Sequence, residues 1–140
     1  MASTIHIDIV SAEEEIYSGE ATMVFAPAKM GEVGIAPQHT PLMTRLKPGS
    51  IRIQVDGGEE QSIYVSGGML EIQPHVITVL ADTATRAKDI DEAAAISAKE
   101  RAEQTLQDKA SEIDIAKAQA ELAEALAQLS ALENLRKSLK

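Results

Sequence analysis

Residues 31–49 read GEVGIAPQHTPLMTRLKPG and form the most informative stretch of this 140-residue chain. The stretch holds three of the eight glycines and three of the five prolines. Proline fixes its own φ angle and glycine permits turns that other residues avoid, so the stretch predicts a rigid, irregular surface rather than a plain strand or helix. It offers no nucleophile and no cluster of metal ligands. We therefore expect a surface that contacts a partner.

Length and composition indicate one domain, or one small domain with an appendage. Aromatic residues make up 2% of the chain, with one Phe and no Trp. The core is therefore expected to consist of Ile, Val, Leu, Met and Ala. The absence of cysteine excludes disulfides and thiolate metal sites.

The net charge of −9 argues against nonspecific nucleic-acid binding. No apolar run approaches the roughly 20 residues that span a bilayer. The first ten residues lack the pattern of a signal or transit peptide. The sequence therefore predicts a soluble chain made in the cytosol, one that can still dock on a membrane complex.

The chain divides at Pro74, after which it contains no glycine and no proline. Before Pro74, β-branched residues alternate with polar ones, and turn residues at 56–58 and 67–68 separate the runs. This pattern predicts an N-terminal antiparallel β-sandwich or barrel over residues 1–86, able to fold alone. The expected strands include residues 5–9, 21–25, 51–55, 62–65, 69–73 and 76–81.

Residues 87–140 have a helical period and predict an antiparallel hairpin of two helices. Carboxylates at 89–92 suit the start of a first helix, which runs to about Gln107. Ser111 or Asp114 is a candidate cap for the second helix. One face of that helix is apolar. It consists of Ile115, Ala118, Leu122, Leu126, Leu129 and Leu132.

The two helices are expected to meet along a thin seam rich in alanine. Alanine lets helices approach closely but buries little area, and at about 25 cal/mol per Å² the gain is small. The hairpin is therefore a candidate for opening. The alternative is that it stays packed as a fixed appendage.

No catalytic constellation stands out. The sequence lacks a phosphate-binding loop and a dinucleotide fingerprint. His6, His39 and His75 lack the spacing of a zinc site. We therefore expect no catalytic residue, no metal and no cofactor.

Four segments together resemble one family, the epsilon subunit of bacterial F-type ATP synthase. They are residues 31–42, 47–49, 64–74 and 79–82, and the similarity extends in order along essentially the whole chain. The resemblance implies a β-sandwich of about ten strands followed by a C-terminal two-helix domain.

The resemblance also implies a noncatalytic rotor subunit of the central stalk. The sandwich would lie against the gamma subunit and the loops of the c-ring and couple rotation to proton flow. The hairpin would be a mobile arm that extends into the alpha/beta catalytic head and inhibits ATP hydrolysis. The location implied is peripheral, on the cytoplasmic face of the bacterial inner membrane.

The family's contact residues map onto two groups of positions. In the sandwich, Glu32 resembles the acidic contact to the c-ring loop, or is an exposed turn carboxylate, and His39 is a contact or a packing residue. The full set at this interface is Glu32, Val33, Gly34, His39, Pro41 and Leu42. In the arm, Arg136 and Lys137 resemble basic residues that meet the catalytic beta subunit, or form a solvated helix end. The full set in the arm is Leu122, Leu126, Leu129, Arg136 and Lys137.

Some relatives bind ATP through the motif Ile/Leu-Asp-x-x-Arg-Ala at the start of the first helix. Here the matching positions are Ile90, Asp91, Ala94 and Ala95, so alanine replaces the arginine. A methyl group cannot donate the charge-assisted hydrogen bonds that hold phosphate, and Arg101 lies about two turns further on. We therefore expect no ATP bound at useful affinity. An ATP-sensing subunit and a purely structural subunit with a static hairpin remain the alternatives.

Overall fold

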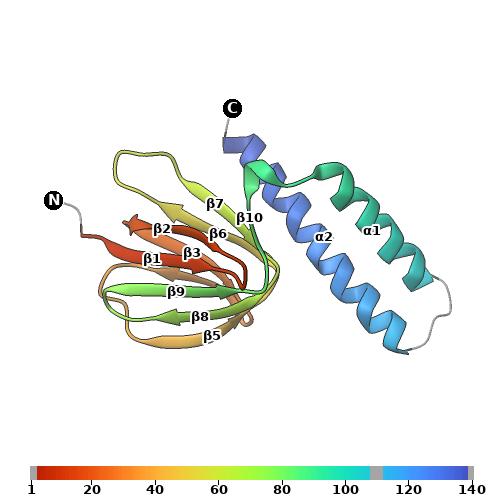
Figure 1. Cartoon of the computed structure of the whole chain (residues 1–140), viewed down its shortest axis with the longest axis horizontal. Helices are drawn as coiled ribbons and strands as arrows, with labels where there is room; N and C mark the ends of the chain where they lie inside the picture. Colours follow the sequence, from red (N-terminus) through yellow and green to blue (C-terminus); the bar gives the residue numbers. More distant parts are fainter. Residues whose placement is uncertain (1–2, 108–111, 139–140) are drawn as a thin grey trace. The chain divides into compact units, whose positions relative to one another are not determined.

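The computed structural model describes residues 3–107 and 112–138 of the chain. It divides into two compact units, Met1–Arg86 and Ala87–Lys140 (Figure 1). The first unit contains the strands and the second the helices.

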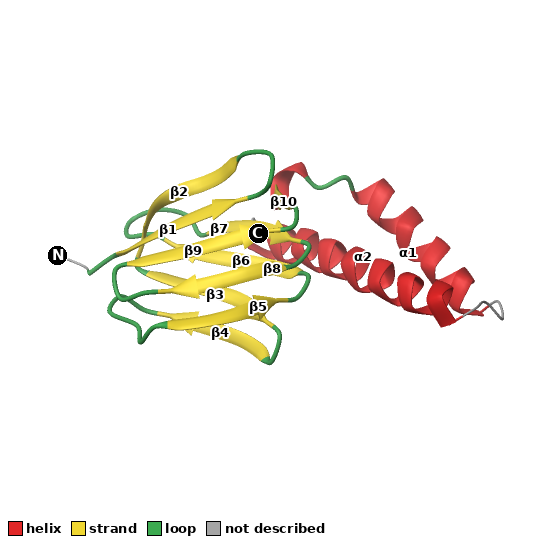
Figure 2. Cartoon of the chain, turned by 60° about the horizontal axis from the view of Figure 1, so that its bottom comes forward, coloured by secondary structure: helices red, strands yellow, loops and turns green. Residues whose placement is uncertain are grey.

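The first unit is a β-sandwich of ten strands, which confirms the predicted fold class. Its sheet follows the order β10-β7-β6-β3-β5-β8-β9-β1-β2, with β4 paired to β3, and wraps around one apolar core (Figure 2). The strands are β1 (Ile5–Val10), β2 (Glu15–Ala21), β3 (Met23–Ala28), β4 (Gly31–Ile35), β5 (Leu42–Leu46), β6 (Gly49–Gln54), β7 (Gln61–Val65), β8 (Gly68–Ile72), β9 (Val76–Ala81) and β10 (Ala84–Arg86).

One pairing departs from the antiparallel expectation. β1 pairs with β9 in parallel, with His6 opposite Val76 and Val10 opposite Leu80. Parallel neighbours need a long connection, and here the seven intervening strands supply it.

Alternation along the strands creates the core. Ile5, Ile7 and Ile9 of β1 are fully buried, while His6 and Asp8 between them lie on the outer face. The core cluster consists of Ile, Val, Leu and Ala, as the composition predicts, but it contains no methionine. Tyr64 is buried as well.

The stretch 31–49 is more regular than its composition predicts. Residues 36–41 and 47–48 lie outside the strands, while β4 and β5 on either side of residues 36–41 are strands that pair with β3 and β8. Gly31 has a φ of 134°, which explains the glycine at the start of β4. In the segment 36–41, Gln38 has a φ of 69°. Its backbone amide donates a hydrogen bond to the Pro74 carbonyl oxygen at 2.9 Å.

The second unit consists of a short 3₁₀ turn, η1 (Ala87–Asp89), and the helices α1 (Glu92–Gln107) and α2 (Glu112–Ser138). Asp91 caps α1, because its Oδ1 accepts a hydrogen bond from the Ala94 amide at 3.1 Å. Asp114 lies inside α2, so it is not the cap. Ser111, the other candidate, lies outside the described residues.

The seam of the hairpin consists of alanine. Ala95 and Ala102 of α1 are buried seven residues apart, and so are Ala118 and Ala125 of α2. An ion pair joins Glu92 at the start of α1 to Arg136 near the end of α2, which shows that the helices run antiparallel. The seam is thus rich in alanine, as the sequence predicts, and the leucines of the apolar face are less buried than these alanines. Leu122 and Leu129 are half-buried and Leu126 is 45% exposed, because the small alanine side chains occupy the line of closest approach.

Candidate functional site

Glu32 and Gly34 of the predicted interface lie on the outer face of β4. The Glu32 side chain is 55% exposed. Val33 lies between them, is half-buried and packs against the core cluster. This difference follows from the period of two along a strand.

Glu32 is held by a neighbour that the sequence did not single out. Arg52 on β6 approaches the Glu32 carboxylate, with 3.1 Å between Nη2 and Oε1. Its other amino group, Nη1, lies 3.7 Å from Oε1 of Glu60. The guanidinium stacks over the ring of Phe25, 4.4 Å from its centroid. Glu32 is thus a partner in a surface cluster rather than an isolated turn carboxylate.

His39 and Pro41 lie on the segment between β4 and β5, and Leu42 is the first residue of β5. Pro41 and Leu42 are exposed, whereas His39 is half-buried. His39 Nδ1 lies 2.6 Å from the Thr40 carbonyl oxygen, which requires the proton on Nδ1. These three residues therefore border the same end of the sheet without making a catalytic arrangement.

An exposed apolar patch was missed from the sequence. It lies across β5, β8 and β9, where Met43 is 64% exposed and Leu80 is 55% exposed. Met69 pairs with Leu80 across the strands, and all three side chains line one shallow pocket. Outward positions on a solvated sheet are normally polar, so the outward Leu80 in VITVLA was the available signal.

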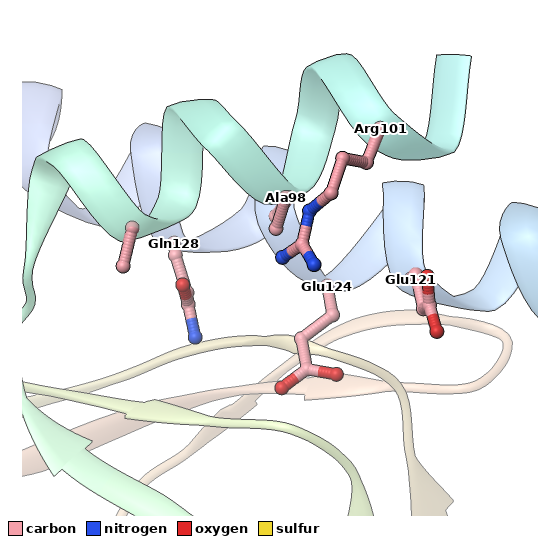
Figure 3. A pocket seen from close by; sticks show the side chains of 7 residues that line it. Ala98, Arg101, Glu121, Glu124 and Gln128 are labelled. Carbon is pink, nitrogen blue, oxygen red and sulfur yellow. The ribbon is translucent and has the colours of Figure 1, made fainter. Parts of the chain in front are cut away.

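The helical unit has a groove on one side of the alanine seam (Figure 3). Arg101 reaches into it from α1, and Glu121, Glu124 and Gln128 line it from α2. Ala94, at the arginine position of the ATP motif, lines the same groove, while Ala95 lies in the seam. The groove therefore presents one guanidinium and two carboxylates, a poor charge match for a triphosphate.

The two basic residues of the arm have carboxylate partners inside the helical unit. Arg136 pairs with Glu92 of α1. Lys137 pairs with Glu133 one turn earlier, at 3.5 Å. Ile90, the first residue of the degenerate motif, is half-buried next to the capping Asp91.

A polar cluster on β1 and β2 also escaped the sequence analysis. His6 Nε2 lies 2.9 Å from Asp8 Oδ1, and His6 Nδ1 lies 3.1 Å from Glu20 Oε2. The hydrogen bond to Asp8 raises the pKa of His6 above its ordinary 6.5, against an opposing effect of desolvation. The Ser18 hydroxyl, which donates to Asp8 at 2.7 Å, lowers the pKa of Asp8 below its ordinary 3.8.

Within residues 3–107 and 112–138, no helix is long and apolar enough to span a bilayer. Across the same residues, no group of three or more His, Asp or Glu side chains is arranged to hold a metal ion.

The chain matches two family models in succession. Residues 4–87 match the beta-sandwich domain of the ATP synthase delta/epsilon chain, and residues 88–133 match its long alpha-helix domain. The chain therefore belongs to the ATP synthase delta/epsilon family.

Curated relatives narrow the family to one type. The chain is 66% identical to the ATP synthase epsilon chain of Nitrosococcus oceani over 139 residues, which is 99% of both chains. It is 61% identical to the ATP synthase epsilon chain of Halorhodospira halophila, again over 99% of both chains. It is accordingly an epsilon-type member, as the sequence resemblance indicated.

Two solved structures have the same fold. One is a chain of the Euglena gracilis mitochondrial ATP synthase in a structure of OSCP, F1 and the c-ring. It has a TM-score of 0.84 and 21% identity, and the alignment covers 92% of this chain and 81% of that one. The other is from the central stalk and c-ring of the Tetrahymena thermophila mitochondrial ATP synthase. It has a TM-score of 0.66 and 12% identity, with coverage of 93% and 97%.

Proposed function

We propose that this chain is a noncatalytic central-stalk subunit of F-type ATP synthase, peripheral to the cytoplasmic face of the bacterial inner membrane. Its β unit docks on the gamma subunit and the c-ring loops and couples rotation to proton flow. Its helical unit is an arm that inhibits ATP hydrolysis by extending into the alpha/beta catalytic head.

The observation that carries the docking proposal is the exposed patch of Met43, Met69 and Leu80. Contiguous apolar side chains on a sheet face with a polar rim are typical of a protein–protein contact. Arg45, Glu71 and Thr78 provide that rim, since they share the outward positions of the same strands. We assign the patch to gamma and Glu32 to a polar c-ring loop.

The alanine seam supports the mobile arm. Alanine buries less apolar area than the leucine of an ordinary helical core, so the closed hairpin gains little free energy from its seam. In the closed hairpin Arg136 is already paired with Glu92. Extension of the arm exchanges this carboxylate for one on the catalytic head, so the closed and extended states can lie within a few kcal/mol of each other.

Truncation after Ala87 tests the inhibitory role in the assembled enzyme. The β unit has its own core and should still assemble, while hydrolysis should rise because the arm is absent. The measurement is the ATP hydrolysis rate of membranes with full-length or truncated chain, at equal content of the chain. An unchanged rate overturns the inhibitory role and leaves the docking role intact.

Two alternatives have separate tests. We expect no ATP binding by the isolated chain, because Arg101 faces Glu121 and Glu124 across the groove. Calorimetry with Mg-ATP showing saturation at physiological concentration would instead establish an ATP sensor. If the hairpin is static, a cross-link between α1 and α2 should leave the ATP hydrolysis rate unchanged. If the arm is mobile, the same cross-link holds it closed and the ATP hydrolysis rate should rise.

A further inference from the structure

The side chain of Arg52 lies on the outer face of the sandwich in a fixed place. Ile51 and Ile53 on either side of it are fully buried, so the strand directs Arg52 outward. Arg52 lies opposite Phe25 in the β3–β6 register, and its guanidinium stacks on the Phe25 ring. A planar guanidinium suits this contact with an aromatic ring, which restricts where the Arg52 side chain can lie.

Gly34 makes room for the stack. It lies opposite Phe25 on the other side, in the β3–β4 register. A Cβ atom at residue 34 would lie 3.3 Å from Cε1 of Phe25 and 3.2 Å from Cε of Met23. The backbone of Gly34 is not in the left-handed region, so here glycine provides space rather than a turn. This explains a glycine of the stretch 31–49 that lies inside a regular strand.

We propose that Arg52 is a positioning residue that fixes the Glu32 carboxylate for its contact with the partner. The inference rests on the proposed contact of Glu32 with a polar c-ring loop. An exposed glutamate rotates freely, and ordering it on binding reduces affinity. The ion pair with Arg52 orders it beforehand.

The cluster retains the capacity to bind a partner. Arg52 contacts only Oε1 of Glu32, and a carboxylate has about four acceptor positions. Glu60 also faces Arg52, so two carboxylates share one guanidinium and the cluster keeps one net negative charge. A hydrogen-bond donor or a cation on the partner loop fits this surface.

The test measures the dissociation constant of the full-length chain for ATP synthase membranes stripped of it. Glu32→Gln should weaken binding, because it removes the contact. Arg52→Gln should weaken binding about two- to tenfold, the range expected for ordering one side chain. In the Glu32→Gln background, Arg52→Gln should have no further effect, because Arg52 acts only through Glu32. Arg52→Lys should recover part of the loss, since it keeps the charge but not the planar fork.

Glu59→Gln is the matched control, since it removes an exposed carboxylate from the same segment between β6 and β7 and lies outside the cluster of Glu32, Arg52 and Glu60. It should leave the dissociation constant unchanged. If Glu32→Gln has no effect, the Glu32 contact in the proposed function is wrong. If Glu32→Gln weakens binding and Arg52→Gln does not, only the positioning role is overturned. An equal loss from Arg52→Gln in both backgrounds also overturns it, because Arg52 then acts independently of Glu32.

Discussion

Two glycines show that the same residue type has different structural roles at different places. Gly68 has a φ of 141°, and a Cβ atom there would lie 2.1 Å from the carbonyl oxygen of Leu80. Gly57 has a φ of 71° with no atom within 4 Å of the added Cβ. Gly68 is thus required by both conformation and space, and Gly57 by conformation alone.

We expect Gly68→Ala to reduce the free energy of unfolding by about 3 kcal/mol or more, the sum of backbone strain and overpacking. Gly57→Ala, the matched control, should cost about 1–2 kcal/mol from strain alone. Urea unfolding followed by the β-sheet circular dichroism signal measures both. Equal losses would show that the close approach of β9 at Gly68 is unimportant.

The cluster around His6 predicts a pH dependence of stability. Both ring nitrogens face carboxylates, and only the protonated ring can donate to both. Because the folded pKa of His6 is raised, its stabilisation is fully present below about pH 6.5 and is lost as the pH rises through the raised pKa. His6→Gln should therefore lower the melting temperature at pH 5.5 more than at pH 8.5.

The difference should be small, because the His6 and Asp8 side chains are more than a third exposed. Asp8 acts in the opposite direction. Its lowered pKa gives a stabilisation that is present above about pH 3.8 and is lost as the pH falls through the lowered pKa. A His6→Gln melting difference that is the same at both pH values would contradict the role of the charged ring.

At the scale of elements, sequence alternation predicted six of the ten strands, missing β2, β4, β5 and β10, and it did not predict which strands pair. The buried isoleucines of β1 and β6 are visible as a period of two. The parallel pairing of β1 with β9 is a long-range choice that no local pattern encodes. Leu80 shows how far the sequence could predict the candidate site. Its outward position can be recognised from the sequence, but the apolar patch exists only because the fold places Met43 and Met69 beside it.

The hairpin and the alanine character of its seam were both predicted, but of the seam alanines in α2 the sequence analysis named Ala118 and not Ala125. A helical period does not distinguish a leucine stripe from a neighbouring alanine stripe, since both repeat every seven residues. The partner helix decides between them. Here close approach favours Ala118 and Ala125 over Leu122 and Leu129.

We expect Ala125→Leu to separate the helices and destabilise the hairpin by about 1–3 kcal/mol, the usual cost of overpacking. Ala123→Leu is the matched control, because Ala123 is exposed on the same helix and leucine is a good helix former. Amide hydrogen exchange of α1 and α2 in the full chain measures the opening. Equal protection in the two variants would show that the alanine seam does not limit packing.

At the scale of the whole molecule, the two units differ in the apolar residues that they bury. The β unit contains the large apolar core, so loss of the helices should leave it folded, and this makes the truncation of the arm interpretable. The helical unit contains only alanine among its buried residues, within the part of the chain that the structure describes. The change of composition after Pro74 indicated this division, because glycine and proline suit turns between strands and disfavour helices. The ion pairs of Glu32 and Arg136 depend on the assembled fold and could not be foreseen.

The parallel pairing of β1 with β9 also constrains the order of folding. β1 is synthesised before the seven strands β2 to β8, and its parallel neighbour begins at Val76. Until β9 has left the ribosome, β1 has only β2 beside it, and the sheet cannot close. Contacts so distant along the chain slow folding, whereas the local contacts of the helical pair form fast. The β unit therefore completes its fold only when nearly all of its own sequence has been made, while the helices are still being translated.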